Sequence, residues 1–200
     1  TLRMVDQGSE KIKLLTPVKV GDVELKNRVV MAALTRQRCD YETSVPNDLH
    51  VEYYSARASA GLILTECTAI APEGNSFPGA AGIYTDEQTA GWKRVTDAVH
   101  EKGGVIHLQI WHGGRATHPN HVNGLQTYGA SAIAIDNTVH TKNGREQHVA
   151  PKACTKEDIQ RLIGDFRRGA ENAKRAGFDG IQLHGAHGYI VDQFAKESSN

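Results

Sequence analysis

The order of apolar and amphipathic segments along the chain constrains the fold more than any other feature. Short runs rich in Val, Ile and Leu, the composition of strands buried on both faces, occur at residues 29–33, 61–65, 105–111 and 180–184. Segments with helical character lie between strands, at residues 48–60, 85–102 and 155–176. Strands that alternate with helices in this way predict a parallel sheet with right-handed crossovers.

Two of the predicted helices carry clear start signals. Thr85 is followed by Gln88 in the form of a capping box, in which the hydroxyl and the amide satisfy unpaired backbone groups. Thr155 begins the helix over 155–176, and Gly177 follows its end. Apolar residues recur with the helical period, at Trp92, Val95 and Val99 and again at Ile159, Leu162, Ile163, Phe166, Ala170 and Ala173. Each helix therefore has one face that packs against the sheet.

The number of strand–helix units suggests part of a larger fold. A closed (β/α)8 barrel needs eight units and about 250 residues, whereas these 200 residues supply four units. We therefore interpret residues 1–200 as a single α/β domain, the amino-terminal half of a TIM barrel, with a hairpin over residues 14–25 placed to plug its bottom. A small doubly wound domain is the alternative, but no Gly-x-Gly-x-x-Gly follows any predicted strand. Residues 112–151 are polar without a strong period, as functional loops often are.

Charge, hydropathy and cysteine content exclude several classes of protein. Lys plus Arg balance Asp plus Glu at 23 each, so we expect no nucleic-acid surface. No apolar run is long enough to span a bilayer, and residues 1–8 lack the apolar core of a secretory signal. Cys39, Cys67 and Cys154 give neither a disulfide framework nor a paired metal spacing. This pattern favours a reducing compartment, and we expect a cytoplasmic protein.

Polar residues gather where each predicted strand ends. They are Thr35 and Arg36, then Thr65, Glu66 and Cys67, then Gln109, Trp111, His112 and Arg115, and finally His184, His187, Tyr189, Asp192 and Gln193. The carboxyl ends of parallel strands meet at one end of such a fold, where the chemistry is placed. We therefore expect these side chains to line a common pocket.

Four blocks of sequence carry a resemblance to a known family. Residues 31–36 read Met-Ala-Ala-Leu-Thr-Arg, and residues 53–63 read Tyr-Tyr-Ser-Ala-Arg-Ala-Ser-Ala-Gly-Leu-Ile. Residues 108–115 read Leu-Gln-Ile-Trp-His-Gly-Gly-Arg, and residues 184–194 read His-Gly-Ala-His-Gly-Tyr-Ile-Val-Asp-Gln-Phe. In this order and spacing the chain resembles the amino-terminal half of the old yellow enzymes. The last block is closer to their 12-oxophytodienoate-reductase-like branch.

The resemblance implies catalytic roles for three residues. His184 and His187 would bind the carbonyl oxygen of the substrate, where two N–H donors stabilise the negative charge that grows during hydride transfer. Tyr189 would give a proton to the α-carbon, because a phenol with an ordinary pKa of about 10 stays protonated at neutral pH. Without the resemblance, the histidines could equally be surface or metal-binding groups, and Tyr189 a packing residue.

The resemblance also implies a binding site for FMN. Thr35 would donate a hydrogen bond that tunes the electron affinity of the flavin ring, and the amide of Gln109 would suit the mixed N–H and C=O edge of that ring. The full set of implied cofactor contacts is Ala33, Leu34, Thr35, Cys67, Gln109 and His184. The implied substrate contacts are Phe77, His184, His187 and Tyr189.

In the implied reaction NADPH, or alternatively NADH, reduces FMN, and the flavin then reduces the C=C bond of an α,β-unsaturated carbonyl compound. Quinones and nitro compounds are further substrates by resemblance. The phosphate site of such barrels follows strands seven and eight, so the remaining half of the barrel is needed as a partner. We expect residues 1–200 alone neither to fold stably nor to retain FMN. The oligomeric state stays open, and neither nucleic acid nor a membrane is expected as a partner.

Two interpretations of other classes compete with this ene-reductase. A metal-dependent TIM-barrel hydrolase would use His107, His112, His184 and His187, although no carboxylate joins that cluster naturally. A non-catalytic half-barrel fragment is the other alternative. Bound FMN is yellow and zinc is colourless, so visible absorbance separates the flavoprotein from the hydrolase. The favoured interpretation includes no metal site.

Overall fold

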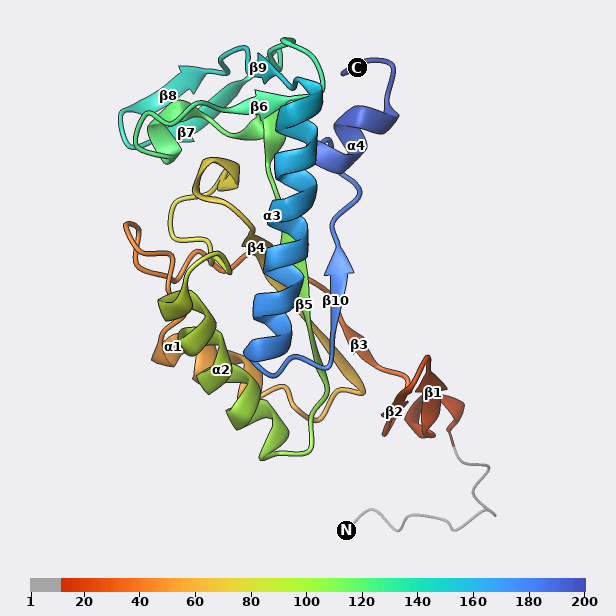
Figure 1. The fold of residues 1–200 in the computed structure, drawn as a ribbon. Coiled ribbons are helices and arrows are strands. Elements are labelled where there is room, and N and C mark those ends of the chain that lie inside the picture. Colours follow the sequence, from red (N-terminus) through yellow and green to blue (C-terminus); the bar gives the residue numbers. More distant parts are fainter. Residues whose placement is uncertain (1–11) are drawn as a thin grey trace, which may run out of the picture.

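A four-stranded parallel sheet forms the centre of the computed structural model, which describes residues 12–200 (Figure 1). The strands are β3 (Val30–Met31), β4 (Leu62–Ala69), β5 (Ile106–Trp111) and β10 (Gly180–Leu183). Their order in the sheet, β10-β5-β4-β3, is also their order along the chain. In a doubly wound sheet the strand order reverses at a switch point, whereas in a barrel neighbouring strands are consecutive along the chain. The predicted parallel sheet is confirmed, and residues 1–8 lie outside the described part.

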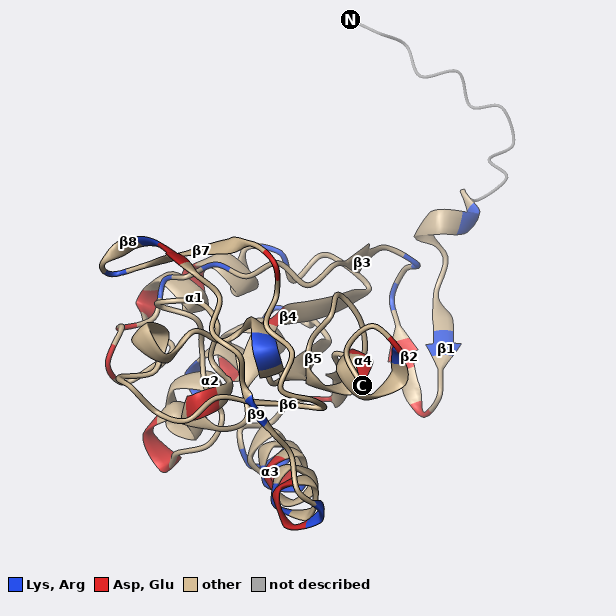
Figure 2. Cartoon of the chain, turned by 90° about the horizontal axis from the view of Figure 1, so that it is seen from above, with Lys and Arg blue, Asp and Glu red and all other residues tan. Residues whose placement is uncertain are grey.

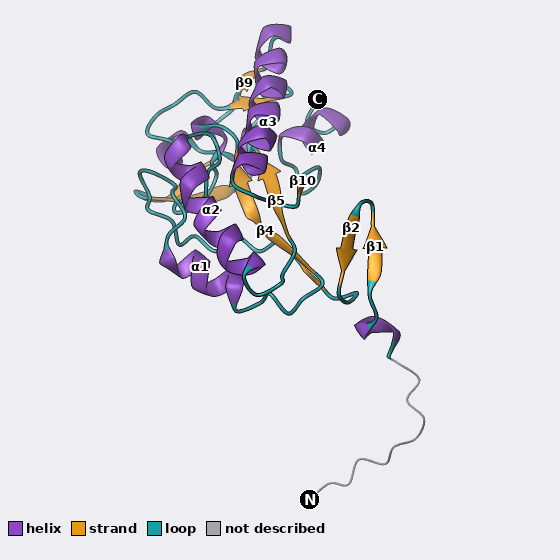
Figure 3. Ribbon diagram, turned by 60° about the horizontal axis from the view of Figure 1, so that its bottom comes forward, coloured by secondary structure: helices purple, strands orange, loops and turns teal. Residues whose placement is uncertain are grey.

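Helices cover one face of this sheet (Figures 1 and 3). They are α1 (Asp48–Ser55), α2 (Asp86–His100) and α3 (Lys156–Arg175), and the short α4 (Ile190–Ala195) follows β10. Thr85 and Thr155 are N-caps, as predicted, and Thr155 also forms a capping box, with Asp158, that was predicted only for Thr85. The core between the layers contains Ile63, Ile106 and Leu108 from the strands and, from the helices, Tyr54, Trp92, Val95, Val99 and Ala173. Every second residue of β5 thus faces the helices.

Three predicted boundaries need correction. Helix α1 ends at Ser55, not at residue 60, and turns complete the path to Gly61. Strand β3 contains only Val30 and Met31 of the predicted residues 29–33. Strand β4 runs on to Ala69, beyond the predicted end at residue 65. The chain passes close to Asn27 just before β4, which explains the glycine at position 61. A Cβ atom there would lie 2.0 Å from the backbone oxygen of Asn27.

Strand β4 contains a β-bulge in the half that reaches the site. Leu64 pairs with His107, but the next pair is Cys67 with Gln109, so β4 has one residue more than β5 over this stretch. Thr65 Oγ1 accepts the Gln109 N–H at 3.1 Å, which satisfies a donor beside the irregular pairing. Ile63 and Cys67 would share a face in a regular strand. Here Ile63 packs in the helix-side core while Cys67 turns to the opposite face.

The long segment after β5 is more ordered than its composition predicts. It contains the antiparallel hairpin of β7 (Thr138–Thr141) and β8 (Gly144–Gln147), and the parallel pair β6 (Tyr128–Gly129) and β9 (Lys152–Ala153). The short 3-10 helices are η1 (Lys13–Leu15), η2 (Pro72–Gly74), η3 (Gly114–Ala116) and η4 (Pro119–His121). The β7–β8 hairpin lies beyond the carboxyl ends of the strands, at the top of Figure 1. The expectation of an irregular loop over 112–151 is therefore wrong in part.

The predicted hairpin near the start of the chain is confirmed as β1 (Val18–Val20) paired with β2 (Val23–Leu25). It lies at the opposite end of the sheet, where the strands begin (Figure 1). Within residues 12–200 no helix is long and apolar enough to cross a membrane. Figure 2 looks onto the strand ends and shows basic and acidic residues intermingled along the ribbon. Cys39, Cys67 and Cys154 are free, as expected.

The two outer strands of the sheet each pair on one side only within the described residues. Within the outer strand β10, the side chains of Ile181 and Leu183 are exposed. A groove of about 340 Å³ lies there between α3 and α4, lined by Ile159, Leu162, Ile163, Phe166, Leu183, Ile190, Val191 and Phe194. Apolar surface of this kind on an outer strand is typical of a sheet that continues.

Candidate functional site

A cavity of about 320 Å³ lies at the carboxyl ends of the strands, on the face of the sheet opposite the helices. It is lined by Ala33, Thr35, Cys67, Phe77, Gln109, Gln182, Leu183, His184, Gly185, Ala186, His187 and Tyr189. All the site residues that the sequence predicts are in this set except Leu34, which is exposed. The predicted convergence of polar strand ends is confirmed in part, because Thr35, Cys67, Gln109, His184, His187 and Tyr189 meet in this cavity and the other strand-end residues do not line it.

Two pairs of polar side chains form one wall of the cavity. Thr35 Oγ1 lies 3.0 Å from Cys67 Sγ, and Gln109 Nε2 donates to Gln182 Oε1 at 2.7 Å. Burial raises the pKa of Cys67 to about 11, against the hydrogen bond from Thr35. The thiol therefore stays protonated at neutral pH and is a poor nucleophile. This wall offers hydroxyl, thiol and amide groups, with no charge of its own.

Two imidazoles also line the cavity. The ring centroids of His184 and His187 are 5.3 Å apart and nearly perpendicular. The backbone N–H of Ala186 donates to His184 Nδ1 at 3.4 Å, which leaves Nε2 as the N–H donor in the neutral ring. Burial, and secondarily the neighbouring His187, lower the pKa of His184. His184 is therefore neutral at neutral pH, and it offers one directed donor.

The turn between the histidines and α4 brings Tyr189 beside them. His187 has φ of 60° and Gly188 has φ of 75°, two successive left-handed residues that reverse the chain sharply. The ring centroid of Tyr189 then lies 4.9 Å from that of His184. The Gly188 N–H donates to Asp192 Oδ2 at 2.7 Å, which fixes the turn to the first residues of α4. Burial, followed by the nearby Cys67, raises the pKa of Tyr189, so its phenol stays protonated.

Aromatic packing sets the position of this phenol. Trp111 is fully buried and meets Tyr189 edge to face, with ring centroids 5.2 Å apart. Its other contact is a stack with Phe77 at 5.6 Å and 11°. Edge-to-face and offset-stacked pairs are the favoured aromatic arrangements. Trp111 is thus a packing residue, and it positions the rings of Tyr189 and Phe77.

Several polar residues at the strand ends do not reach the cavity. Gln193 is buried, and its Nε2 donates to the backbone oxygens of Gly113 at 3.2 Å and Gly188 at 2.6 Å, so it joins two loops. His112 is buried beside Gly74, and the Gly114 N–H donates to its Nδ1 at 3.0 Å. The other members of this group are Arg36, Thr65, Glu66, Arg115 and Asp192. These residues stabilise the loops around the site.

Sequence reasoning missed one polar residue of the cavity, Gln182. A signal was present, because Gln182 and His184 are two residues apart in a strand and so share a face. Gln182 also stands opposite Gln109 in the β5–β10 register, which only the pairing reveals. For the hydrolase alternative, no group of three or more His, Cys, Asp or Glu that could hold a metal is present in residues 12–200.

The donor set fits the ring of a flavin. Thr35 offers a hydroxyl, while Gln109 and Gln182 offer amides that both donate and accept. The pyrimidine edge of an isoalloxazine alternates C=O and N–H groups, which these side chains can match. A planar ring held by these side chains would share the cavity with His184, His187 and Tyr189, which also line it.

Comparison with known proteins gives a consistent result. The NADH:flavin oxidoreductase / NADH oxidase family profile matches residues 13–200. A putative 12-oxophytodienoate reductase 2 from Oryza sativa subsp. japonica is 42% identical over 195 residues, covering 96% of this chain and 50% of that protein. A probable flavin mononucleotide-dependent alkene reductase from Leishmania infantum is 45% identical over 195 residues, covering 94% of this chain and 53% of that protein.

Solved structures agree on the fold. The old yellow enzyme homologue from Zymomonas mobilis is 41% identical, with a TM-score of 0.90 over 94% of this chain and 52% of that chain. The old yellow enzyme from Trypanosoma cruzi is 38% identical, also with a TM-score of 0.90, over 94% of this chain and 55% of that chain. The chain thus spans about half the length of these relatives. Its four units are the first half of a (β/α)8 barrel, as predicted.

Proposed function

Because the chain belongs to the NADH:flavin oxidoreductase / NADH oxidase family, we propose that the complete protein is an FMN-dependent ene-reductase. It takes hydride from NADPH, or from NADH, and reduces the C=C bond of α,β-unsaturated carbonyl compounds. The observation that carries this proposal is the single cavity that is lined together by Thr35, Cys67, Gln109, His184, His187 and Tyr189. The metal-dependent hydrolase has no comparable support among the described residues.

FMN, when bound, accepts hydride from the nicotinamide and delivers it to the substrate. The residues of this chain that would hold its ring are Ala33, Thr35, Cys67, Gln109 and His184, with Gln182 added by the geometry. A backbone contact from Leu34 stays a prediction. The Thr35 hydroxyl would donate to a ring carbonyl, and the amides of Gln109 and Gln182 would share the pyrimidine edge.

The histidine pair would bind the substrate carbonyl. His184 is neutral with Nε2 as its donor, since Nδ1 accepts from Ala186. His187 lies at 5.3 Å from it, centroid to centroid, so both rings can reach one oxygen. Fixed donors of this kind act where negative charge develops, and the loss of one typically costs about 10²–10³ in rate. Phe77 would contact the substrate through its ring alone.

Tyr189 would supply the proton that completes the reduction. Its raised pKa keeps the phenol protonated, and its ring lies 4.9 Å from that of His184, so the O–H would be close to a carbonyl compound bound by that histidine. After hydride reaches the β-carbon, the electron pair on the α-carbon takes the phenolic proton, and solvent reprotonates the phenolate. Quinones and nitro compounds can use the same donors. Three free cysteines favour the cytoplasm as the location.

Visible absorbance tests the proposal on the complete protein. We expect the purified protein to be yellow, with the spectrum of oxidised flavin, to bleach with NADPH, and to recover its colour on addition of a small enone such as cyclohexenone. The phosphate of FMN is expected on the later strands, so the complete protein is required. A protein that is colourless and does not bind added FMN contradicts the proposal.

A further inference from the structure

The segment that carries Thr35 has little regular structure of its own. Strand β3 ends at Met31, and residues 32–38 have no helix or strand. Besides the contact of the Thr35 hydroxyl with Cys67, two hydrogen bonds tie this segment to the rest of the fold. The Arg36 N–H donates to Glu66 Oε2 at 3.0 Å, and Asn47 Nδ2 donates to the Arg38 backbone oxygen at 2.7 Å. The first of these bonds is one residue away from the Thr35 hydroxyl.

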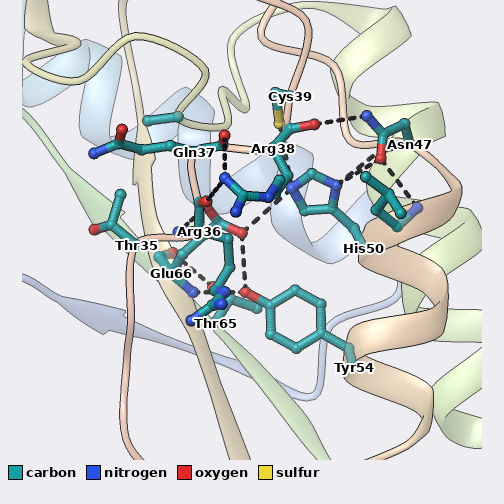
Figure 4. Close-up of polar contacts among 12 residues, drawn as sticks. Thr35, Arg36, Gln37, Arg38, Cys39, Asn47, His50, Tyr54, Thr65 and Glu66 are labelled. Carbon is teal, nitrogen blue, oxygen red and sulfur yellow. Dashed lines mark hydrogen bonds and ion pairs between the residues drawn. The ribbon is translucent and has the colours of Figure 1, made fainter.

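The acceptor of that bond is a completely buried carboxylate. Glu66 Oε1 accepts from the Tyr54 hydroxyl at 3.2 Å and lies 3.3 Å from His50 Nε2 (Figure 4). The Asn47 N–H donates to His50 Nδ1 at 3.2 Å, so Nε2 carries the ring proton and points at Glu66. A buried carboxylate is costly unless hydrogen bonds surround it. Both oxygens of Glu66 have partners, and both sets of partners lie outside the cavity.

The β-bulge of β4 explains why Glu66 faces these partners. The extra residue between Leu64 and Cys67 lets Cys67 enter the cavity while its neighbour Glu66 points toward α1 and the Thr35 segment. Tyr54 of α1 also accepts the Glu66 N–H at 2.9 Å. Bulges are concentrated next to active sites, where they redirect side chains.

A second contact clamps residue 36 to the same helix. The Arg36 guanidinium lies over the ring of Tyr53, 4.5 Å from its centroid, and Arg57 lies over the same ring at 3.8 Å. The backbone of Arg36 is thus held by Glu66 and its side chain by α1. Thr35, directly before it, lies against Cys67 at the cavity wall. The position of the Thr35 hydroxyl therefore depends on the carboxylate behind it.

We propose that Glu66 is a positioning residue, which holds the Thr35 hydroxyl against the flavin through its hydrogen bond to the Arg36 N–H. This inference rests on the proposed function. A hydroxyl that donates to a flavin carbonyl favours the reduced ring, which carries more negative charge there. Loss of the anchor lets residues 32–38 move and weakens that bond. The midpoint potential of bound FMN then falls.

The test measures the midpoint potential of FMN in the complete protein, by spectrophotometry with reference dyes. We expect Glu66→Ala to reduce the preference for reduced over oxidised flavin about tenfold, which for a two-electron couple is about 30 mV. Glu66→Gln keeps an oxygen that can accept the Arg36 N–H, so it should restore most of the potential. Thermal unfolding of each variant records its stability separately.

Asp165 provides the matched control. It is also a buried carboxylate, and it forms ion pairs with Arg161 and Arg168 of the same helix, α3. It makes no contact with the Thr35 segment. Asp165→Asn should lower stability and leave the potential unchanged. In a Thr35→Val background, Glu66→Gln and Glu66→Ala should shift the potential no further, because the group they position is absent.

Three results would overturn the inference while the proposed function stands. They are an unchanged potential in Glu66→Ala, an equal shift in Asp165→Asn, or an undiminished shift in the Thr35→Val background. If Glu66→Ala does not fold, Glu66→Met, which fills a similar volume without an acceptor for the Arg36 N–H, takes its place alone and with Thr35→Val, and additive effects of the two changes contradict positioning. A wild-type protein that binds no FMN would instead refute the proposed function, and this inference with it.

Discussion

The buried imidazole of His112 makes the fold sensitive to acid in a defined pH range. The ring is fully buried, and burial lowers its pKa from 6.5 to about 4, against the opposing influence of Glu73. Gly74 packs on the ring so closely that a Cβ there would lie 2.5 Å from Cδ2. Nε2 has no hydrogen-bond partner within the described part of the chain. A proton added to this nitrogen would therefore have no hydrogen-bond acceptor, and the attraction of Glu73 offsets only part of the cost of burying the charge.

The sign and size of the effect follow from the two pKa values. Between pH 4 and 6.5 the unfolded chain binds the proton and the folded chain does not, so a fall in pH favours unfolding. The stabilisation is complete above pH 6.5 and is lost as the pH falls to about 4. At about 1.4 kcal/mol for each pKa unit, His112 accounts for a loss of about 3 kcal/mol over this range.

His112→Asn isolates this contribution. The Asn oxygen can accept the Gly114 N–H that Nδ1 now accepts at 3.0 Å, and Asn does not titrate. The variant should be less stable at pH 7.5, because the packing of the ring is lost. From pH 6.5 to 4, however, it should lose about 3 kcal/mol less than the wild type.

The assay is urea unfolding of the complete protein at a series of pH values, with the exposed His140 replaced by Asn as a control. Contributions of other titrating groups are common to both proteins and cancel in the difference. His140→Asn should follow the wild-type curve. Stability curves of wild type and His112→Asn that run parallel through this pH range would refute the reasoning.

Three further predictions concern the site and the scaffold. Tyr189→Phe should slow enone reduction by about 10²–10⁴ and leave flavin reduction by NADPH unchanged; stopped-flow absorbance measures both steps, and equal slowing would contradict the proton-donor role. Thr85→Ala removes the acceptor of the Gln88 N–H, at 3.1 Å, and should cost about 1 kcal/mol in urea unfolding, whereas Thr85→Ser should cost little. Gly61→Ala places a Cβ 2.0 Å from the Asn27 backbone oxygen, and should cost about 3 kcal/mol or more by the same assay; an effect as small as that of Thr85→Ser would show that the β3–β4 entry adjusts freely.

Periodicity and capping predict the main elements of this fold because they act locally. Thr85 and Thr155 begin helices in the structure as predicted from their capping side chains, since the cap bonds join residues three apart. Strands β4, β5 and β10 appear where apolar runs predict them. Their order in the sheet follows from right-handed crossovers between consecutive units. These features need no knowledge of distant contacts.

The details of the site depend on contacts between distant segments, and sequence reasoning found them less completely. The resemblance identified Cys67 as a site residue, but simple alternation from Ile63 would have placed it on the helix side. The bulge that turns it inward is visible only in the pairing with β5. Glu66 was grouped with the polar strand ends, yet its carboxylate lies behind the cavity wall. No local pattern distinguishes these two directions.

Some signals were present and were not used. Lys142 and Asn143 join β7 to β8, and Gly144 is the first residue of β8, so the Asn-Gly pair that often marks a hairpin stands at the end of this turn. The strands themselves lack apolar alternation, which is why the segment reads as a loop. Helix α1 ended early for a different reason. Turns replace its last predicted helical residues, because the chain must reach Gly61, whose backbone passes close to Asn27.

The unpaired edges of β3 and β10 have a consequence for how such a protein is made. The amino-terminal strands leave the ribosome first. Until later strands emerge, the nascent chain exposes the outer edges of β3 and β10 and the apolar groove beside Leu183. Parallel sheets form slowly, because each contact must wait for a long crossover. During translation we therefore expect this segment to benefit from a chaperone that binds exposed strand edges. Slower elongation after it should favour aggregation over completion of the sheet.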